Sequence, residues 1–170
     1  IPSEFAIHVY KELWQSGQEM DIANVGYRAI ESLRMEKGYL YWSGDISPDY
    51  SPLEAGLGFR VHFDLKDDFL GRQALESQMK NGLDRKLFTF VSEQFLPLTG
   101  GETILESDRV VSLATSVAYG FTVKKTIIRG YLDRLYWGKT EFTVEVFGQR
   151  YPVKLAFSPV YDPKNLALKG

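Results

Sequence analysis

Apolar residues in the first half of the chain recur every three to four positions, which is the spacing of a helix that buries one face. This pattern predicts helices over residues 3–17, 27–37 and 71–80. Ser3 is suited to cap the first helix, because its hydroxyl can accept a backbone hydrogen bond from the first turn. A glycine closes or follows each segment, at Gly17, Gly38 and Gly82, as expected at helix C-termini.

The second half has a different pattern, in which apolar and polar residues alternate over short segments. Strands are predicted over residues 85–91, 102–107, 108–116, 127–132, 141–147 and 150–157, and one earlier strand over residues 59–63. Gly148-Gln149 is predicted to form the two-residue hairpin loop between the last two strands. Pro152 lacks an N–H donor, which indicates that the final strand lies near a sheet edge.

The two patterns meet near residues 81–85, so we expect two domains, residues 1–82 and residues 83–170. Many short strands at regular spacing are typical of a compact barrel or sandwich. We therefore expect residues 85–158 to form a closed or nearly closed β unit with its own core. The fold class predicted for the whole chain is α+β.

Composition excludes several classes of function. The chain has 170 residues, 44% of them hydrophobic and 25% charged, as in a soluble globular protein. A formal net charge of −2 gives no reason to expect binding to nucleic acid or an anionic membrane. Without cysteine there is no thiolate chemistry, and the two histidines, far apart in sequence, suggest neither a metal site nor a catalytic triad.

No apolar run approaches the ~20 residues of a membrane helix, and no signal peptide is recognisable at the start. The chain begins at Ile1 rather than at a methionine. We interpret it as a fragment of a longer protein that is not secreted.

Glu36 is placed unusually, near the C-terminus of the second predicted helix. A negative charge there opposes the helix dipole, at a cost of roughly 0.3–1 kcal/mol. Two interpretations are open. Glu36 is either a solvated charge paired with Arg34 or Lys37, or a carboxylate that accepts two parallel hydrogen bonds from the edge of an amino-pyrimidine ring.

Other motifs carry less information. The segment AGLGF, residues 55–59, has two glycines in GxG spacing but no third, so a turn is a better interpretation than a dinucleotide site. Asp45 and Glu54 are candidates for an acid–base pair, although an aspartate in a turn is equally explained by capping its own backbone. Several aromatic residues are core candidates, and one or two of them could stack on a planar ligand: Tyr27, Tyr39, Tyr41, Trp42 and Phe59.

The segment GYRAIESLRMEKGYLYWSGDISPDYSPLEAGLGF, residues 26–59, followed by KDDFLGRQAL, residues 66–75, resembles the folate-binding domain of the glycine-cleavage T-protein (aminomethyltransferase) superfamily. Within it, the similarity is to the C-terminal region of dimethylglycine and sarcosine dehydrogenases. The later VVSLATSVAYGFTVKKTIIRGYL, residues 110–132, resembles the superfamily's small C-terminal barrel. The resemblance implies the rear half of a folate-binding domain followed by a small antiparallel β-barrel domain.

The resemblance also implies which residues contact the cofactor. SLRME, residues 32–36, matches the segment that holds the family's pterin-binding glutamate, so this role carries to Glu36. A basic residue is matched by Lys66, with Arg60 as a competitor, and an aromatic near the chain's end by Tyr161. Tyr27 is a further candidate. The family's catalytic aspartate would precede Ile1, so no catalytic residue and no metal ligand is assigned.

In the intact parent, tetrahydrofolate would then capture a one-carbon unit from an oxidised methylamine, and FAD would belong to a missing N-terminal domain. The fragment would pack against the preceding part of its own chain and would be inactive alone. Replacing Glu36 with alanine would weaken folate binding with little effect on stability. The alternative is a regulatory interaction protein resembling the regulatory subunit of pyruvate dehydrogenase phosphatase. The expected location is the bacterial cytoplasm or the mitochondrial matrix.

Overall fold

The computed structural model describes residues 1–65, 68–157 and 159–169. The chain forms two compact units, of which the first ends at Ile30 and the second begins at Glu31. This division differs from the two domains expected from the sequence, and the boundary between residues 82 and 83 stays a prediction.

The first unit is helical, as predicted. It contains the 3-10 turn η1 (Ser3–Phe5), helix α1 (Ala6–Gly17) and the 3-10 turn η2 (Gln18–Met20). The predicted cap is wrong, because neither η1 nor α1 begins with a side-chain cap hydrogen bond. The apolar stripe of α1 remains open to solvent, with Phe5 and Leu13 both exposed.

Helix α2 (Tyr27–Lys37) ends at Gly38, as predicted. Gly38 adopts φ 80°, the left-handed conformation that glycine tolerates best. Its N–H donates to the carbonyl oxygen of Met35 at 3.3 Å, and the N–H of Tyr39 donates to that of Arg34 at 2.9 Å. This is a Schellman motif, which satisfies two of the carbonyl groups left free at a helix end.

The predicted strand over residues 59–63 is wrong. The chain there forms the 3-10 turn η3 (Gly58–Arg60), and local turn bonds join Arg60 N to Leu57 O at 2.9 Å and Val61 N to Gly58 O at 3.0 Å. Alternation of Phe59, Val61 and Phe63 indicated a strand, but these residues have no strand partner among the described residues. Helix α3 (Arg72–Asn81) follows, one residue later than predicted.

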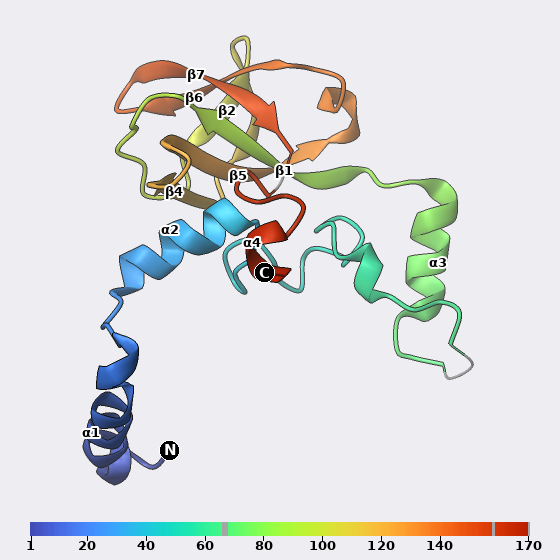
Figure 1. Ribbon diagram of the computed structural model, residues 1–170. Coiled ribbons are helices and arrows are strands. Elements are labelled where there is room, and N and C mark those ends of the chain that lie inside the picture. Colours follow the sequence, from blue (N-terminus) through green and yellow to red (C-terminus); the bar gives the residue numbers. More distant parts are fainter. Residues whose placement is uncertain (66–67, 158, 170) are drawn as a thin grey trace. The chain divides into compact units, whose positions relative to one another are not determined.

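Seven antiparallel strands form one curved sheet (Figure 1). They are β1 (Arg85–Ser92), β2 (Thr103–Glu106), β3 (Arg109–Leu113), β4 (Ser116–Gly120), β5 (Lys125–Asp133), β6 (Glu141–Val146) and β7 (Gln149–Ala156), in the order β3-β2-β6-β7-β1-β5-β4. Each of the six segments predicted beyond residue 84 overlaps a strand of the sheet. Strand β4 was not predicted as a separate strand, and only its first residue, Ser116, falls in a predicted segment. A turn, η4 (Arg134–Tyr136), and a short helix, α4 (Leu166–Lys169), complete the elements.

The β6–β7 hairpin is confirmed, but its loop lies one residue earlier than predicted. Val146 pairs with Gln149, so the loop is Phe147-Gly148, with φ values of 49° and 76°. Positive φ at both loop residues matches the twist of the flanking strands. The edge position inferred from Pro152 is wrong, because β7 lies between β6 and β1. Pro152 is tolerated because β1 pairs only with Lys154, Leu155 and Ala156 of β7.

The sheet curls back on itself into a half-barrel. Three strands separate β5 from β2 in sheet order. Yet a Cβ atom at Gly130 of β5 would lie 3.0 Å from Ile104 Cδ1 on β2 and 3.0 Å from the carbonyl oxygen of Leu113 on β3. The two edges therefore face each other, and glycine permits the close approach. The prediction of a nearly closed β unit is confirmed.

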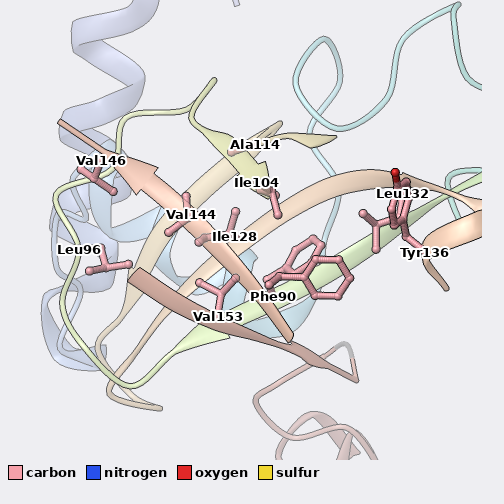
Figure 2. Packing of buried hydrophobic residues seen from close by; sticks show 11 residues of the cluster. Phe90, Leu96, Ile104, Ala114, Ile128, Leu132, Tyr136, Val144, Val146 and Val153 are labelled. Atoms are coloured by element: carbon pink, nitrogen blue, oxygen red, sulfur yellow. The ribbon is translucent and has the colours of Figure 1, made fainter. Parts of the chain in front are cut away.

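Figure 2 shows the core that fills this curl. The rings of Phe90 and Phe142 meet edge to face at 5.3 Å, and aliphatic side chains from β2, β5, β6 and β7 surround them. The buried cluster comprises Phe90, Leu96, Ile104, Ala114, Ile128, Leu132, Tyr136, Phe142, Val144, Val146 and Val153. Alternate residues of β5 point the other way, so both faces of this strand are buried.

Candidate functional site

Glu36 lies in the last turn of α2 and is 1% exposed. Its Oε1 accepts hydrogen bonds from the backbone N–H groups of Thr122, at 2.7 Å, and Val123, at 3.1 Å. Both donors belong to the turn between β4 and β5. These two bonds compensate the charge that opposes the helix dipole, since charge-assisted hydrogen bonds are among the stronger ones.

Gly120 makes room for the Glu36 side chain. A Cβ atom at Gly120 would lie 2.9 Å from both Cγ and Oε1 of Glu36 and 2.8 Å from Cγ2 of Val123. These separations are shorter than a carbon atom tolerates. A glycine at the end of β4 is therefore needed for the Glu36 carboxylate to pack against this strand.

The solvated interpretation of Glu36 is wrong, because neither neighbouring cation pairs with it. Arg34 pairs with Glu31 at 2.7 Å and with Asp45 at 3.0 Å, and Lys37 pairs with Asp162 at 2.8 Å. Of the two carboxylate oxygens of Glu36, only Oε1 accepts a hydrogen bond from the described residues. Its Oε2 keeps the capacity to accept two more.

Tyr161 lies beside Glu36, although the two residues are 125 positions apart in the sequence. The backbone N–H of Tyr161 donates to the carbonyl oxygen of Glu36 at 3.0 Å. The Lys37 ammonium lies 5.9 Å from the centre of the Tyr161 ring, which is 38% exposed as a residue. The structure thus brings together two of the residues that the sequence proposed for one pocket.

For the remaining proposed residues, the role in this site stays a prediction. Tyr27 is exposed at the start of α2, in the first unit. Arg60 is exposed in η3, where its guanidinium lies 5.1 Å from the ring centre of Phe59, and no described contact joins it to Glu36. Lys66 lies outside the described residues. The aromatic residues Tyr39, Tyr41, Trp42 and Phe59 are all exposed, so they are not core residues in this structure.

A second buried carboxylate, Asp45, organises the loop after α2. It is 0% exposed, and its Oδ2 lies 3.0 Å from Arg34 Nη1 and 3.2 Å from Arg129 Nη1. Its Oδ1 accepts a hydrogen bond from the Thr115 hydroxyl at 2.9 Å, and Tyr41 N–H donates to Oδ2 at 3.0 Å. The turn-capping interpretation of Asp45 is therefore correct but incomplete, because the same carboxylate also holds the loop to β5.

Arg129 is a buried charged residue of this region that the sequence pattern did not identify as a candidate. It stands in β5 between apolar neighbours and is 1% exposed. Burial lowers the pKa of its guanidinium, and the charge of Asp45 opposes this shift. Its Nη1 also donates to the carbonyl oxygen of Tyr39 at 2.8 Å. A single charge inside an apolar strand pattern was the signal, because a buried charge needs a partner.

Tyr131, two residues further along β5, contacts the same loop. Its hydroxyl donates to the carbonyl oxygen of Asp45 at 2.8 Å, and its ring stacks on Tyr50 at 3.7 Å. Burial raises the pKa of the Tyr131 phenol, with smaller contributions from Tyr50, Asp45 and Glu54. The neutral phenol is therefore the form that the fold favours.

Asp45 and Glu54 do not form an acid–base pair. Glu54 accepts a hydrogen bond from Ser51 N–H at 2.8 Å and pairs with Arg85 at 3.1 Å, whereas Asp45 pairs with Arg34 and Arg129. Each carboxylate anchors a different part of the loop to the sheet. Within the described residues, no cluster of His, Asp and Glu could hold a metal ion, and no helix is long and apolar enough to cross a membrane.

Two family models match the chain. The GCVT N-terminal domain matches residues 1–65, and the glycine cleavage T-protein C-terminal barrel domain matches residues 85–162. Mouse mitochondrial sarcosine dehydrogenase is 37% identical over 100% of this chain, and human mitochondrial dimethylglycine dehydrogenase is 32% identical over 92%. The mouse regulatory subunit of mitochondrial pyruvate dehydrogenase phosphatase is 31% identical over 94%.

Among solved structures, the glycine cleavage system aminomethyltransferase T from Bartonella henselae has the same fold, with a TM-score of 0.82 over 95% of this chain at 22% identity. The chain covers 45% of that structure. It covers only 18–20% of the length of the three relatives named above. The similarity therefore concerns one region of much longer proteins.

Proposed function

We propose a function for this chain from the premise that it belongs to the glycine-cleavage T-protein (aminomethyltransferase) superfamily. In the full-length protein, this region forms part of a tetrahydrofolate site. The bound folate receives a one-carbon unit from an oxidised methylamine such as sarcosine or dimethylglycine. The FAD that oxidises the amine is held by another region of the same protein, and the expected compartment is that of the mitochondrial relatives.

The observation that supports this proposal most is the buried Glu36 carboxylate beside Tyr161. Main-chain donors hold Oε1 in place, so the carboxylate needs no reorganisation when a ligand arrives. The pterin edge presents N–H donors, and Oε2 has unused lone pairs with which to accept from this edge. Oε1 already accepts two hydrogen bonds, so Oε2 is the atom that accepts a hydrogen bond from the pterin ring.

The residues present fit tetrahydrofolate in this limited sense. Folate supplies the nitrogen atoms that carry the one-carbon unit. The chain itself supplies a fixed negative charge to orient the pterin and, in Tyr161, a partly exposed aromatic ring beside it. Arg60, Lys66 and Tyr27 are proposed as further contacts on the strength of the family resemblance.

A regulatory role is the second candidate, and one observation favours it. The regulatory subunit of pyruvate dehydrogenase phosphatase is nearly as similar to this chain as the dehydrogenases are. A protein of that kind would keep the fold while its pocket no longer served a reaction. Binding of tetrahydrofolate that depends on Glu36 distinguishes the two candidates.

Glu36→Gln and Glu36→Ala separate the two tasks of this side chain. The glutamine carbonyl can still accept from Thr122 and Val123, but its amide group cannot accept from the pterin. We expect Glu36→Gln to weaken tetrahydrofolate binding about tenfold, with a small change in thermal stability. We expect Glu36→Ala to weaken binding at least as much. Contrary to the expectation from the sequence, it should also lower the free energy of unfolding by about 1–3 kcal/mol, since the Thr122 and Val123 N–H groups lose their acceptor.

Calorimetric titration of tetrahydrofolate into the full-length protein, with thermal melts in parallel, measures both effects. Glu76→Gln is the matched control, because Glu76 is exposed on α3 and pairs only with Arg72 among the described residues. It should bind like the wild type. Equal affinities for wild type and Glu36→Gln would leave Glu36 with a structural role alone and would contradict the proposal.

A further inference from the structure

We infer that the C-terminal segment, residues 161–169, is a latch, and that the Lys37–Asp162 ion pair closes it on the end of α2 and so holds Tyr161 against the Glu36 site. This inference rests on the proposed function for its effect on the ligand. The latch itself rests only on contacts in the second unit. Lys37 and Asp162 are positioning residues that act through Tyr161.

The ion pair is well enclosed. Lys37 Nζ lies 2.8 Å from Asp162 Oδ2 and 2.8 Å from the carbonyl oxygen of Asp162, and the two side chains are only 14% and 9% exposed. Exposed pairs contribute little to stability because water screens them. A shielded pair with two charge-assisted bonds is a stronger restraint.

Asp162 also organises the segment that follows it. It adopts φ 44°, its Oδ1 accepts a hydrogen bond from Leu166 N–H at 2.6 Å, and its carbonyl oxygen accepts one from Asn165 N–H at 3.0 Å. One side chain therefore bonds α2 through Oδ2 and the start of α4 through Oδ1. The Lys37 bond lowers the pKa of the Asp162 carboxyl, which keeps it charged at neutral pH.

The latch acts directly on the proposed site because each of its two residues is the next residue in the sequence after a residue of the site. Lys37 follows Glu36, and Asp162 follows Tyr161. The N–H of Tyr161 donates to the carbonyl oxygen of Glu36, a group that the helix end would otherwise leave free. Once the Asp162 carboxylate charge is removed, three described links remain at this point: this main-chain bond, the bond from Lys37 Nζ to the carbonyl oxygen of Asp162, and the weak contact between Lys37 and the Tyr161 ring. Removing the Lys37 ammonium group leaves only the main-chain bond among the described links.

Asp162→Asn and Lys37→Met test the latch in the full-length protein. Asparagine tolerates the left-handed conformation and can still accept from Leu166, so this variant removes chiefly the charge. Methionine keeps an unbranched stem without the ammonium group. Lys164→Met is the matched control, because Lys164 is exposed in the same segment and has no described ion pair.

Hydrogen exchange of peptides covering residues 161–169 reports the latch without any ligand. We expect exchange there to rise about tenfold in both variants and in the double variant, and to stay at the wild-type rate in Lys164→Met. Titration of tetrahydrofolate should show a Kd raised about five- to tenfold in each variant. The double variant should be no weaker than the single ones, because the two residues form one interaction.

Unchanged exchange in Asp162→Asn would overturn the latch. Faster exchange with an unchanged Kd would overturn its coupling to the site. A wild-type protein that binds no tetrahydrofolate would overturn the proposed function instead, while faster exchange in both variants would still establish the latch.

Discussion

At the scale of single residues, the same side-chain type serves quite different purposes in this chain. Glu36 and Asp45 are both almost fully buried carboxylates. Asp45 pairs with two arginines, whereas Glu36 accepts only from backbone donors among the residues that the structure describes. Asp45 is therefore saturated by its own fold. Glu36 retains an acceptor atom, and for this reason it is the better candidate for binding a ligand.

Tyr131 allows the contact between the loop and β5 to be tested through the pH dependence of stability. Its folded-state pKa is raised, so its contribution to stability is complete below the unfolded value of about 10 and is lost as the pH rises further. Tyr131→Phe should lose about 1 kcal/mol at pH 8, the worth of one hydrogen bond. The difference in the free energy of unfolding between Tyr131→Phe and the wild type should become smaller above pH 10.

Urea unfolding at pH 8 and pH 10.5 measures this narrowing. Tyr39→Phe provides the comparison, since the Tyr39 ring is exposed and should leave the pH dependence unchanged. A constant difference between Tyr131→Phe and wild type at both pH values would contradict the shifted pKa.

At the scale of elements, the loop after α2 is held to β5 by polar contacts rather than by an apolar face. Arg129 and Tyr131 project from one side of β5 to Asp45, while Ile128 and Leu132 project from the other side into the barrel core. One face of β5 therefore makes polar contacts with the loop, while its other face packs in the hydrophobic core. A shift of the loop away from β5 would leave the buried Arg129 guanidinium without its described carboxylate partner, which is costly in a buried site.

Asp45→Asn tests this attachment. An amide keeps the shape of the carboxylate but leaves Arg129 as a buried charge without a counterion, so we expect the free energy of unfolding to fall by about 3–5 kcal/mol. Chemical denaturation measures the loss. Asp49→Asn, four positions later on the exposed part of the loop, should change stability by no more than about 0.5 kcal/mol. A loss for Asp45→Asn as small as that of the control would show that the network is not structural.

At the scale of the whole molecule, this chain corresponds to about a fifth of the length of its dehydrogenase relatives. Two of the buried carboxylates in the described part of the chain, Asp45 and Glu54, are occupied by ion pairs. We therefore expect the 170-residue chain alone to turn over neither sarcosine nor dimethylglycine. An assay for formaldehyde or for methylated folate, with the full-length protein as positive control, checks this. Measurable turnover by the chain alone would refute it.

The sequence pattern located helices and strands well where a segment's own periodicity decides its structure. It failed for residues 59–63, where alternation was present but the described part of the chain offers no strand to pair with them. It also failed for Pro152, because β1 leaves that part of β7 unpaired although β7 is not an edge strand. Strand pairing depends on partners that are remote in sequence. A local pattern cannot show whether such partners are in place.

By itself, the sequence determined the α+β class, the helix end at Gly38, the β6–β7 hairpin and the prominence of Glu36, because each depends on local periodicity, turn chemistry or a motif within a few residues. Tertiary structure alone decided that β5 approaches the β2–β3 hairpin at Gly130, that Arg129 meets Asp45, and that Tyr161 and Asp162 close on the end of α2. These contacts join residues 84 to 125 positions apart, or strands that are not neighbours in the sheet. They form only when the sheet curls and buries its charges, and burial is a property of the folded chain as a whole.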